Sequence, residues 1–278
     1  MELNSKELSL QECQKASLEV LKSVSCICIN LNLRYFLAYG TLIGAIRHKG
    51  FIPWDDDIDI MMPRKDYQKL VEYFECNKKL LKPLELFDIH THMDYPYMIG
   101  RVSDTRYVIE THNEKDCGMG VFIDIYPMDG LGCNWKWAVK VGMKADHLAS
   151  LCFQSTRLKY EIGTTKSIIK KALKLPVYFY AKVRGKQYFV ERLEKLSREF
   201  SYDTSKYIAC IVWLSGGKRD MFPKAWFEET IDCRFENYSF KIPSRYHEIL
   251  SYIYGDYMKL PPLNEREGHH YYKTYRKE

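Results

Sequence analysis

The chain opens with the pattern of an amphipathic helix. Apolar residues recur in steps of three or four over residues 10–31, which predicts a helix with one buried face. Ser9 precedes this stretch and Glu12 follows three residues later, so the two fit a capping box at the helix start. The mostly apolar run over residues 33–39 (LRYFLAY) then predicts the first strand.

Two later segments alternate apolar and acidic positions. Residues 57–61 and 120–126 are predicted strands, and on a strand residues two apart point to the same face. Asp57 and Asp59 therefore project side by side, with the intervening isoleucines packed beneath. Asp124 is the one acid in the second segment, and a buried carboxylate without a partner is costly. A cation held between Asp57 and Asp59 would provide that partner.

The middle of the chain differs from both ends. Residues 134–200 are predicted to be mostly helical, and between positions 157 and 190 there are nine Lys or Arg residues against one acid, Glu161. Pro176 is expected to divide this basic stretch into two helices. Other predicted elements are a helix starting at Pro63, strands over 97–102, 207–214 and 238–242, and a helix over 244–254 that Gly255 ends.

These elements predict an α+β protein with a mixed β-sheet core, flanking helices and a basic helical insert. We expect a single catalytic domain over residues 1–278. Within it, residues 1–133 form the core, 134–200 form the insert, and 201–278 complete the domain.

Composition and charge narrow the classes of function. The net charge of +6 suits an anionic partner, and the chain shows no nucleic-acid-binding motif, so no nucleic acid is predicted. The nine cysteines form no CxxC pair, which argues against a zinc site or a disulfide framework and favours a reduced, cytoplasmic protein. Neither a signal peptide nor an apolar run long enough to span a membrane is present, so any membrane contact is expected to be peripheral.

The segment DDDID carries the chemistry. Two adjacent carboxylates repel each other, and a hard cation such as Mg²⁺ (or Mn²⁺) between them resolves the repulsion and leaves positions open for substrate phosphates. The alternatives are a solvated acidic loop or an EF-hand-like Ca²⁺ loop, but the glycine and terminal glutamate of an EF-hand are missing. Asp55 and Asp56 are interpreted as loop residues. The sequence thus predicts a metal-dependent phosphate-handling site.

The stretch YGTLIGAIRHKGFIPWDDDIDIMMPRKDY resembles the signature of the LicD family, bacterial phosphocholine transferases related to fukutin proteins. The likeness continues in MIGRVSDTRY, in VFIDIYPMDG and in the C-terminal segment from FPKAWFEETIDCRF onward, and leaves the basic middle poorly matched. The resemblance implies a nucleotidyltransferase-like fold, a divalent metal, and transfer of phosphocholine from CDP-choline to a sugar hydroxyl with release of CMP.

The resemblance also implies roles for particular residues. Asp57 and Asp59 match the metal-binding pair, and Asp124 matches the third carboxylate. Gly40 and Thr41 match a turn whose backbone N–H groups approach a phosphate. Beyond the resemblance, we expect Asp124 to accept the proton of the attacking sugar hydroxyl.

Several cations are candidates for holding the diphosphate. Arg47, His48 and Lys49 follow the Gly-Thr turn closely, with a solvated helix end as the alternative. Arg101 is either aimed at a phosphate or engaged in a structural ion pair near Asp104.

The remaining candidates lie near aromatic or C-terminal positions. His269 and His270 match the terminal HH of the family and are assigned to substrate binding, although paired loop histidines are commonly surface residues. Tyr254 and Tyr257 are candidates for an aromatic cage around the quaternary ammonium of choline. Trp54 either packs the loop or stacks on the base.

The expected partners are CDP-choline and a lipid-linked glycan acceptor, such as a precursor of teichoic acid, lipopolysaccharide or another cell-surface polymer. The basic insert is either a solvated face or a peripheral contact with the anionic inner leaflet of the membrane. Three rival functions stay open. They are transfer of phosphoethanolamine, ribitol phosphate or a nucleotide by the same fold, a DxD glycosyltransferase, and a non-enzymatic membrane-associated scaffold.

Overall fold

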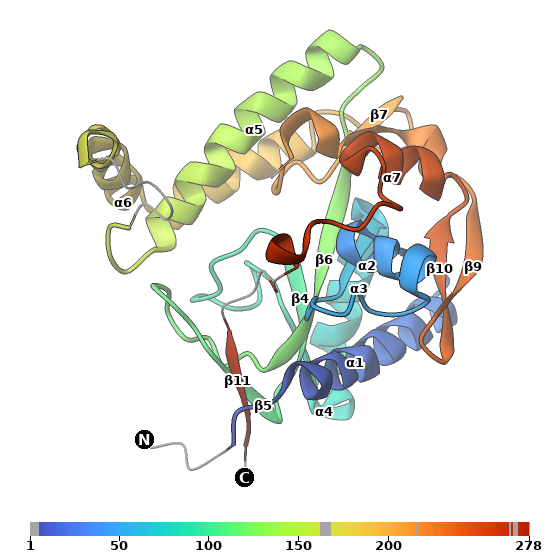
Figure 1. The fold of residues 1–278 in the computed structure, drawn as a ribbon. Helices are drawn as coiled ribbons and strands as arrows, with labels where there is room; N and C mark the ends of the chain where they lie inside the picture. Colours follow the sequence, from blue (N-terminus) through green and yellow to red (C-terminus); the bar gives the residue numbers. More distant parts are fainter. Residues whose placement is uncertain (1–5, 162–167, 215, 267, 269–271, 278) are drawn as a thin grey trace.

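The computed structural model describes residues 6–161, 168–214, 216–266, 268 and 272–277. Its centre is a seven-stranded mixed sheet built around the long strand β6, which is paired on both sides (Figure 1). The strand order is β1 (Phe36–Leu37), β2 (Asp59–Pro63), β6 (Val121–Gly130), β4 (Gly100–Asp104) and β3 (Leu84–Phe87), with β7 (Tyr207–Ala209) paired to β6 and β8 (Met221–Pro223) paired to β7.

The pairing of β2 with β6 is parallel, whereas the other pairs of the sheet are antiparallel. Asp59 is in register with Asp124 on β6, and Asp124 is in register with Arg101 on β4. Residues in register on neighbouring strands point to the same face, so three charged side chains form a row across the sheet. The predicted α+β class with a mixed sheet is confirmed.

The opposite face of the sheet is apolar. Ile58 and Ile60 are fully buried and belong to one hydrophobic cluster with residues of α1 (Leu10–Asn30) and α3 (Arg64–Cys76). The predicted capping box is present, because Ser9 Oγ accepts the backbone N–H of Glu12 and a Glu12 carboxylate oxygen accepts the backbone N–H of Ser9. The alternation of the sequence thus places the isoleucines beneath the sheet and the carboxylates above it.

The basic insert forms two long helices, α5 (Trp135–Thr156) and α6 (Ile168–Ser197). Pro176 was predicted to divide α6, and that prediction is wrong, because the helical interruption falls at Gly185. Gly185 has φ 74°, a conformation that glycine adopts without the steric cost of a Cβ atom. Buried residues of both helices share a hydrophobic cluster with β6 and β7. The division of the chain at residues 133 and 200 stays a prediction.

Several strand bounds differ from those predicted. The first strand is limited to Phe36–Leu37, β2 begins at Asp59, and β7 ends at Ala209. Several strands of the described structure were not predicted. These are β3, β8, a ribbon of β5 (Tyr107–Glu110) with β11 (Lys273–Arg276), and β9 (Thr230–Phe235), which pairs with the predicted β10 (Tyr238–Pro243).

The smaller helices complete the fold. The predicted C-terminal helix is confirmed as α7 (Tyr246–Tyr254), and Gly255 follows it at φ 72°. Among the described residues, none of the helices has the length and apolarity needed to cross a membrane. Besides α7, the short helices of the described structure are α2 (Tyr39–Ile43), η1 (Gly44–His48), α4 (Lys78–Leu81), η2 (Gly217–Asp220), η3 (Lys224–Phe227) and η4 (Leu263–Glu265).

Candidate active site

Asp59 lies at the β2 end of the charged row on the sheet. Its side chain is buried, its backbone N–H donates to Thr41 Oγ1 at 2.8 Å, and its Oδ1 has no hydrogen-bond partner in the described structure. Burial, and then the nearby carboxylates of Asp57 and Asp124, raise the pKa of Asp59 well above its ordinary value. A buried oxygen without a donor, facing other acids, is what a bound cation would satisfy.

The acidic loop before β2 offers further oxygens. One oxygen from each of Asp55, Asp56 and Asp57 can lie within 4.8 Å of the others, which makes them a candidate metal-binding group. Asp57 lies just before the strand, and not on it, because β2 begins at Asp59. Asp57 therefore belongs both to the metal ligands predicted from the sequence, with Asp59 and Asp124, and to this group of loop carboxylates. Asp55, interpreted as a loop residue from the sequence, also lines the active-site cavity.

Asp124 has a partner within the protein. Arg101 Nε donates to Asp124 Oδ1 at 2.6 Å, and the two side chains are 4% and 5% exposed. The Arg101 guanidinium also lies 4.2 Å from the ring of Tyr97 and 4.0 Å from that of Phe122. Of the two roles predicted for Arg101, the structure therefore shows the structural ion pair. Its partner is Asp124 and not Asp104. The sequence analysis inferred a metal near Asp124 because this buried carboxylate had no evident partner. Arg101 is such a partner, so the burial of Asp124 does not by itself require a metal.

The turn predicted at Gly40 and Thr41 is a short helix in the structure. Gly40 and Thr41 lie inside α2 instead of in a turn, and Thr41 serves the site by accepting the Asp59 amide. Gly40 lies under the acidic loop, where an added Cβ would be 2.8 Å from Asp55 Oδ2. The small residue at position 40 thus leaves room for the Asp55 carboxylate.

A cavity of about 870 Å³ lies next to these acids. Its walls come from α2, the acidic loop, β6 and the C-terminal loop that crosses in front of β6 in Figure 1. The cavity is lined by more acids than bases, so it favours a cation or a cation-bearing ligand. The acids are Asp55, Asp57, Asp59, Asp256 and Glu265, and the bases are Arg47 and Lys259.

The three predicted diphosphate-binding cations have different surroundings. Arg47 lines the cavity and donates through Nη1 to the carbonyl oxygens of Tyr257 and Lys259, which ties η1 to the C-terminal loop. His48 lies edge-on to Trp54 and accepts from Arg47 Nε at 2.9 Å. Lys49 is exposed, and it is not among the residues that line the cavity. Arg47 is therefore the member of the trio best placed to meet a ligand.

Aromatic residues form much of the remaining wall. Tyr254, Tyr257 and Trp54, which the sequence singled out, all line the cavity. Sequence reasoning missed Tyr126 and Trp213, which also line it. Tyr126 could have been found, because it lies two residues from Asp124 on the same strand and hence on the same face. Trp213 follows β7, and only the tertiary fold brings it to the site.

Tyr39 is a further residue that the sequence did not single out. It has φ 45°, which is unusual for a bulky residue, and its hydroxyl is buried without a hydrogen-bond partner in the described structure. Its ring lies 5.1 Å from that of Tyr126, and both line the cavity. Backbone strain of this kind is concentrated at functional sites. His269 and His270 lie outside the described residues, while the adjacent Gly268 lines the cavity.

A glycine pair in this segment gives a testable contrast. Gly44→Ala is expected to destabilise the protein by about 1–3 kcal/mol, because the new Cβ would lie 2.4 Å from the backbone oxygen of Gly50. Gly40→Ala meets only the Asp55 side chain, which can rotate, so its effect on stability should be smaller. Urea unfolding of both variants measures the difference. Equal destabilisation by the two substitutions would contradict this account.

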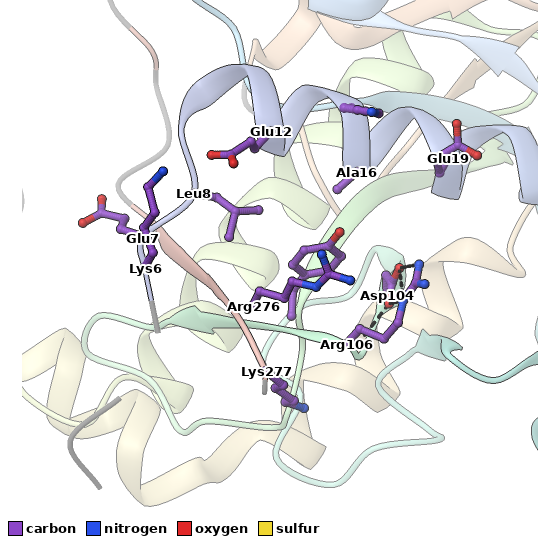
Figure 2. A pocket seen from close by; sticks show the side chains of 12 residues that line it. Lys6, Glu7, Leu8, Glu12, Ala16, Glu19, Asp104, Arg106, Arg276 and Lys277 are labelled. Carbon is purple, nitrogen blue, oxygen red and sulfur yellow. Dashed lines mark hydrogen bonds and ion pairs between the residues drawn. The ribbon is translucent and has the colours of Figure 1, made fainter. Parts of the chain in front are cut away.

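A second hollow of about 700 Å³ lies away from the carboxylates, between the start of α1 and the β5–β11 ribbon (Figure 2). Some of its charged groups have partners within the protein. Arg106 binds Asp104 at 2.6 Å, and Glu12 is engaged in the capping box of α1. This hollow offers no group comparable to Asp59.

A mixed sheet with one strand acid, Asp59, at the wall of a cavity and a second, Asp124, in register with it on the neighbouring strand is typical of a nucleotidyltransferase-like protein. The family model described as "LicD/FKTN/FKRP, nucleotidyltransferase domain" matches residues 32–161. The lipopolysaccharide cholinephosphotransferase LicD of Haemophilus influenzae is 31% identical over 277 residues, which covers 97% of this chain and 99% of that protein. The chain therefore belongs to the LicD family, and the resemblance noted in the sequence is confirmed.

More partial likenesses were also found. An uncharacterized protein of Rickettsia typhi is 30% identical over 127 residues, which cover 45% of this chain and 35% of that protein. An uncharacterized protein of Rickettsia prowazekii is 38% identical over 73 residues, a quarter of each chain.

Proposed function

We propose that this protein is a metal-dependent transferase that moves phosphocholine from CDP-choline to a sugar hydroxyl of a cell-surface glycan precursor and releases CMP. The observation that carries the proposal is the buried, unpartnered Asp59 oxygen at the wall of an acidic and aromatic cavity. The Haemophilus influenzae relative, a lipopolysaccharide cholinephosphotransferase, supports the choice of headgroup and of a glycan acceptor.

Asp57 and Asp59 would hold Mg²⁺ or Mn²⁺, with Asp55 close enough to assist. The metal, when bound, would neutralise charge on the donor diphosphate. Arg47 lines the same cavity and would bind phosphate oxygens as a fixed cation. These residues position the donor so that the phosphorus that carries choline is open to attack.

Asp124, held in place by Arg101, is proposed to accept the proton of the attacking sugar hydroxyl. The sugar oxygen forms a bond to phosphorus while the bond from that phosphorus to the CMP oxygen breaks, and CMP leaves with the electron pair. The aromatic wall, including Tyr254, Tyr257 and Trp213, suits the quaternary ammonium by cation–π attraction.

A reducing, cytoplasmic setting is part of the proposal. All nine cysteines are free thiols, and three of them are buried at positions 28, 152 and 210. Such a set is typical of proteins from compartments in which disulfides do not persist.

Release of CMP tests the proposed reaction. The wild-type protein, incubated with CDP-choline, Mg²⁺ and a lipopolysaccharide or teichoic-acid precursor, is expected to release CMP and to label the glycan with choline. Parallel reactions with CDP-ethanolamine and CDP-ribitol test the headgroup. Faster turnover of either substitute, or no turnover of CDP-choline with any acceptor, would overturn the assignment of phosphocholine.

A further inference from the structure

The half of α6 before Gly185 exposes an unusual number of apolar side chains. Phe179 is 56% exposed and Val183 is 85% exposed, and Leu173 and Tyr180 are also exposed. Among residues 173–184, Tyr178 and Ala181 are buried, and they face the body of the protein. Figure 1 shows this part of α6 at the outer edge of the molecule, far from β6 and α7.

Four of the exposed apolar residues share one side of the helix. With about 3.6 residues per turn, one face of the helix carries these four, spaced by six, one and three residues. They are Leu173, Phe179, Tyr180 and Val183. We call these four residues the apolar stripe. The opposite face is fixed to the protein, because Lys182 Nζ donates to the carbonyl oxygens of Ser155 and Arg157 at 3.1 and 3.0 Å. The stripe is therefore held outward by the fold.

The stretch of sequence that contains the stripe has basic residues and no acidic ones. Arg184 is exposed beside the stripe, Lys174 is exposed on another side of the helix, and the chain has no Asp or Glu between Glu161 and Glu191. The Arg184 guanidinium lies 4.8 Å from the ring of Tyr188 and 5.5 Å from that of Tyr180, so cation and aromatic side chains are interleaved. An apolar face with aromatic residues and flanking cations is the pattern of a helix that lies in the interface of an anionic bilayer.

We propose that the apolar stripe docks the protein onto an anionic lipid bilayer, with Arg184 contacting lipid phosphates. The charge of the segment favours this partner, since every ionised side chain between Glu161 and Glu191 is positive and an anionic membrane surface attracts such segments. The docking does not depend on the proposed transfer reaction. It would bring the active site to a lipid-linked acceptor.

Vesicle co-sedimentation of the full-length protein tests the docking without any substrate. Wild type is expected to bind vesicles of phosphatidylglycerol mixed with phosphatidylcholine more tightly than pure phosphatidylcholine vesicles, and to lose affinity as salt rises. The double variant Phe179→Ser/Val183→Ser should bind at least about tenfold more weakly, because it loses apolar area that enters the bilayer. Arg184→Gln should weaken binding to the anionic vesicles alone.

A matched control is available on α4, at the far side of the molecule from α6 in Figure 1. Leu80 is 77% exposed and is preceded by the exposed Lys79, so Leu80→Ser/Lys79→Gln changes the same kinds of side chain outside the stripe. The control is expected to bind like wild type, and all variants should keep the wild-type melting temperature. Unchanged vesicle binding by the stripe variant would overturn the proposal. So would a wild-type dimer that the stripe variant abolishes, with no vesicle binding.

Discussion

Asp59→Asn is expected to lower phosphocholine transfer by about 10³-fold or more, since a bound metal contributes several kcal/mol to such a reaction. The same substitution is expected to raise the melting temperature of the metal-free protein. Asp59 is a buried carboxylate crowded by Asp57 and Asp124, and an amide removes the cost of that charge. Mg²⁺ should raise the melting temperature of wild type but not that of the variant.

Asp256→Asn is the matched control, because Asp256 lines the same cavity but is exposed in the C-terminal loop. It should keep the thermal response to Mg²⁺. A metal response in Asp59→Asn equal to that of wild type would refute the metal-binding role of Asp59. Asp57→Ala is expected to share the loss of transfer while leaving the fold intact.

The pH dependence of stability follows from the same carboxylate. The pKa of Asp59 is raised in the folded protein, so between the ordinary aspartate pKa and the raised one the native state binds more protons than the unfolded state. The contribution of Asp59 should therefore make the free energy of unfolding of metal-free wild type fall as pH rises through this window. Asp59→Asn should lack this contribution, which urea unfolding across a pH series measures.

Arg101→Met is expected to destabilise the protein by about 3–5 kcal/mol, because it leaves the Asp124 carboxylate buried without its partner. Transfer should be lost as well, since Asp124 loses the group that holds it. Replacing both partners, as Arg101→Met/Asp124→Leu, should restore most of the stability, because a buried ion pair exchanged for apolar residues is often neutral. The double variant should remain inactive.

Arg245→Met provides the comparison for a surface ion pair. Arg245 binds Glu248 at 2.9 Å with both side chains exposed, and its loss should cost less than about 1 kcal/mol. Urea unfolding of the metal-free proteins compares the three variants. If Arg101→Met were as stable as Arg245→Met, the buried pair would not hold Asp124 in the way described.

The sequence by itself determined the local pattern of this protein. Alternation of Asp and Ile placed Asp59 on one face and Ile58 and Ile60 on the other, because strand side chains alternate with a period of two. The capping box fixed the start of α1, and Gly255 fixed the end of α7. Each of these features depends on residues that are close together along the chain, which is why they were predictable.

Only the tertiary structure decided which distant groups meet. The register of β4 with β6 gives Asp124 the partner Arg101, a pairing that spacing along the chain does not reveal. The C-terminal loop supplies one wall of the cavity, α6 is interrupted at Gly185 instead of Pro176, and the bonds of Lys182 to the end of α5 hold the apolar stripe outward. These outcomes depend on long-range packing, whose energies no local pattern encodes. The sequence thus specified the acids, and the fold specified their partners.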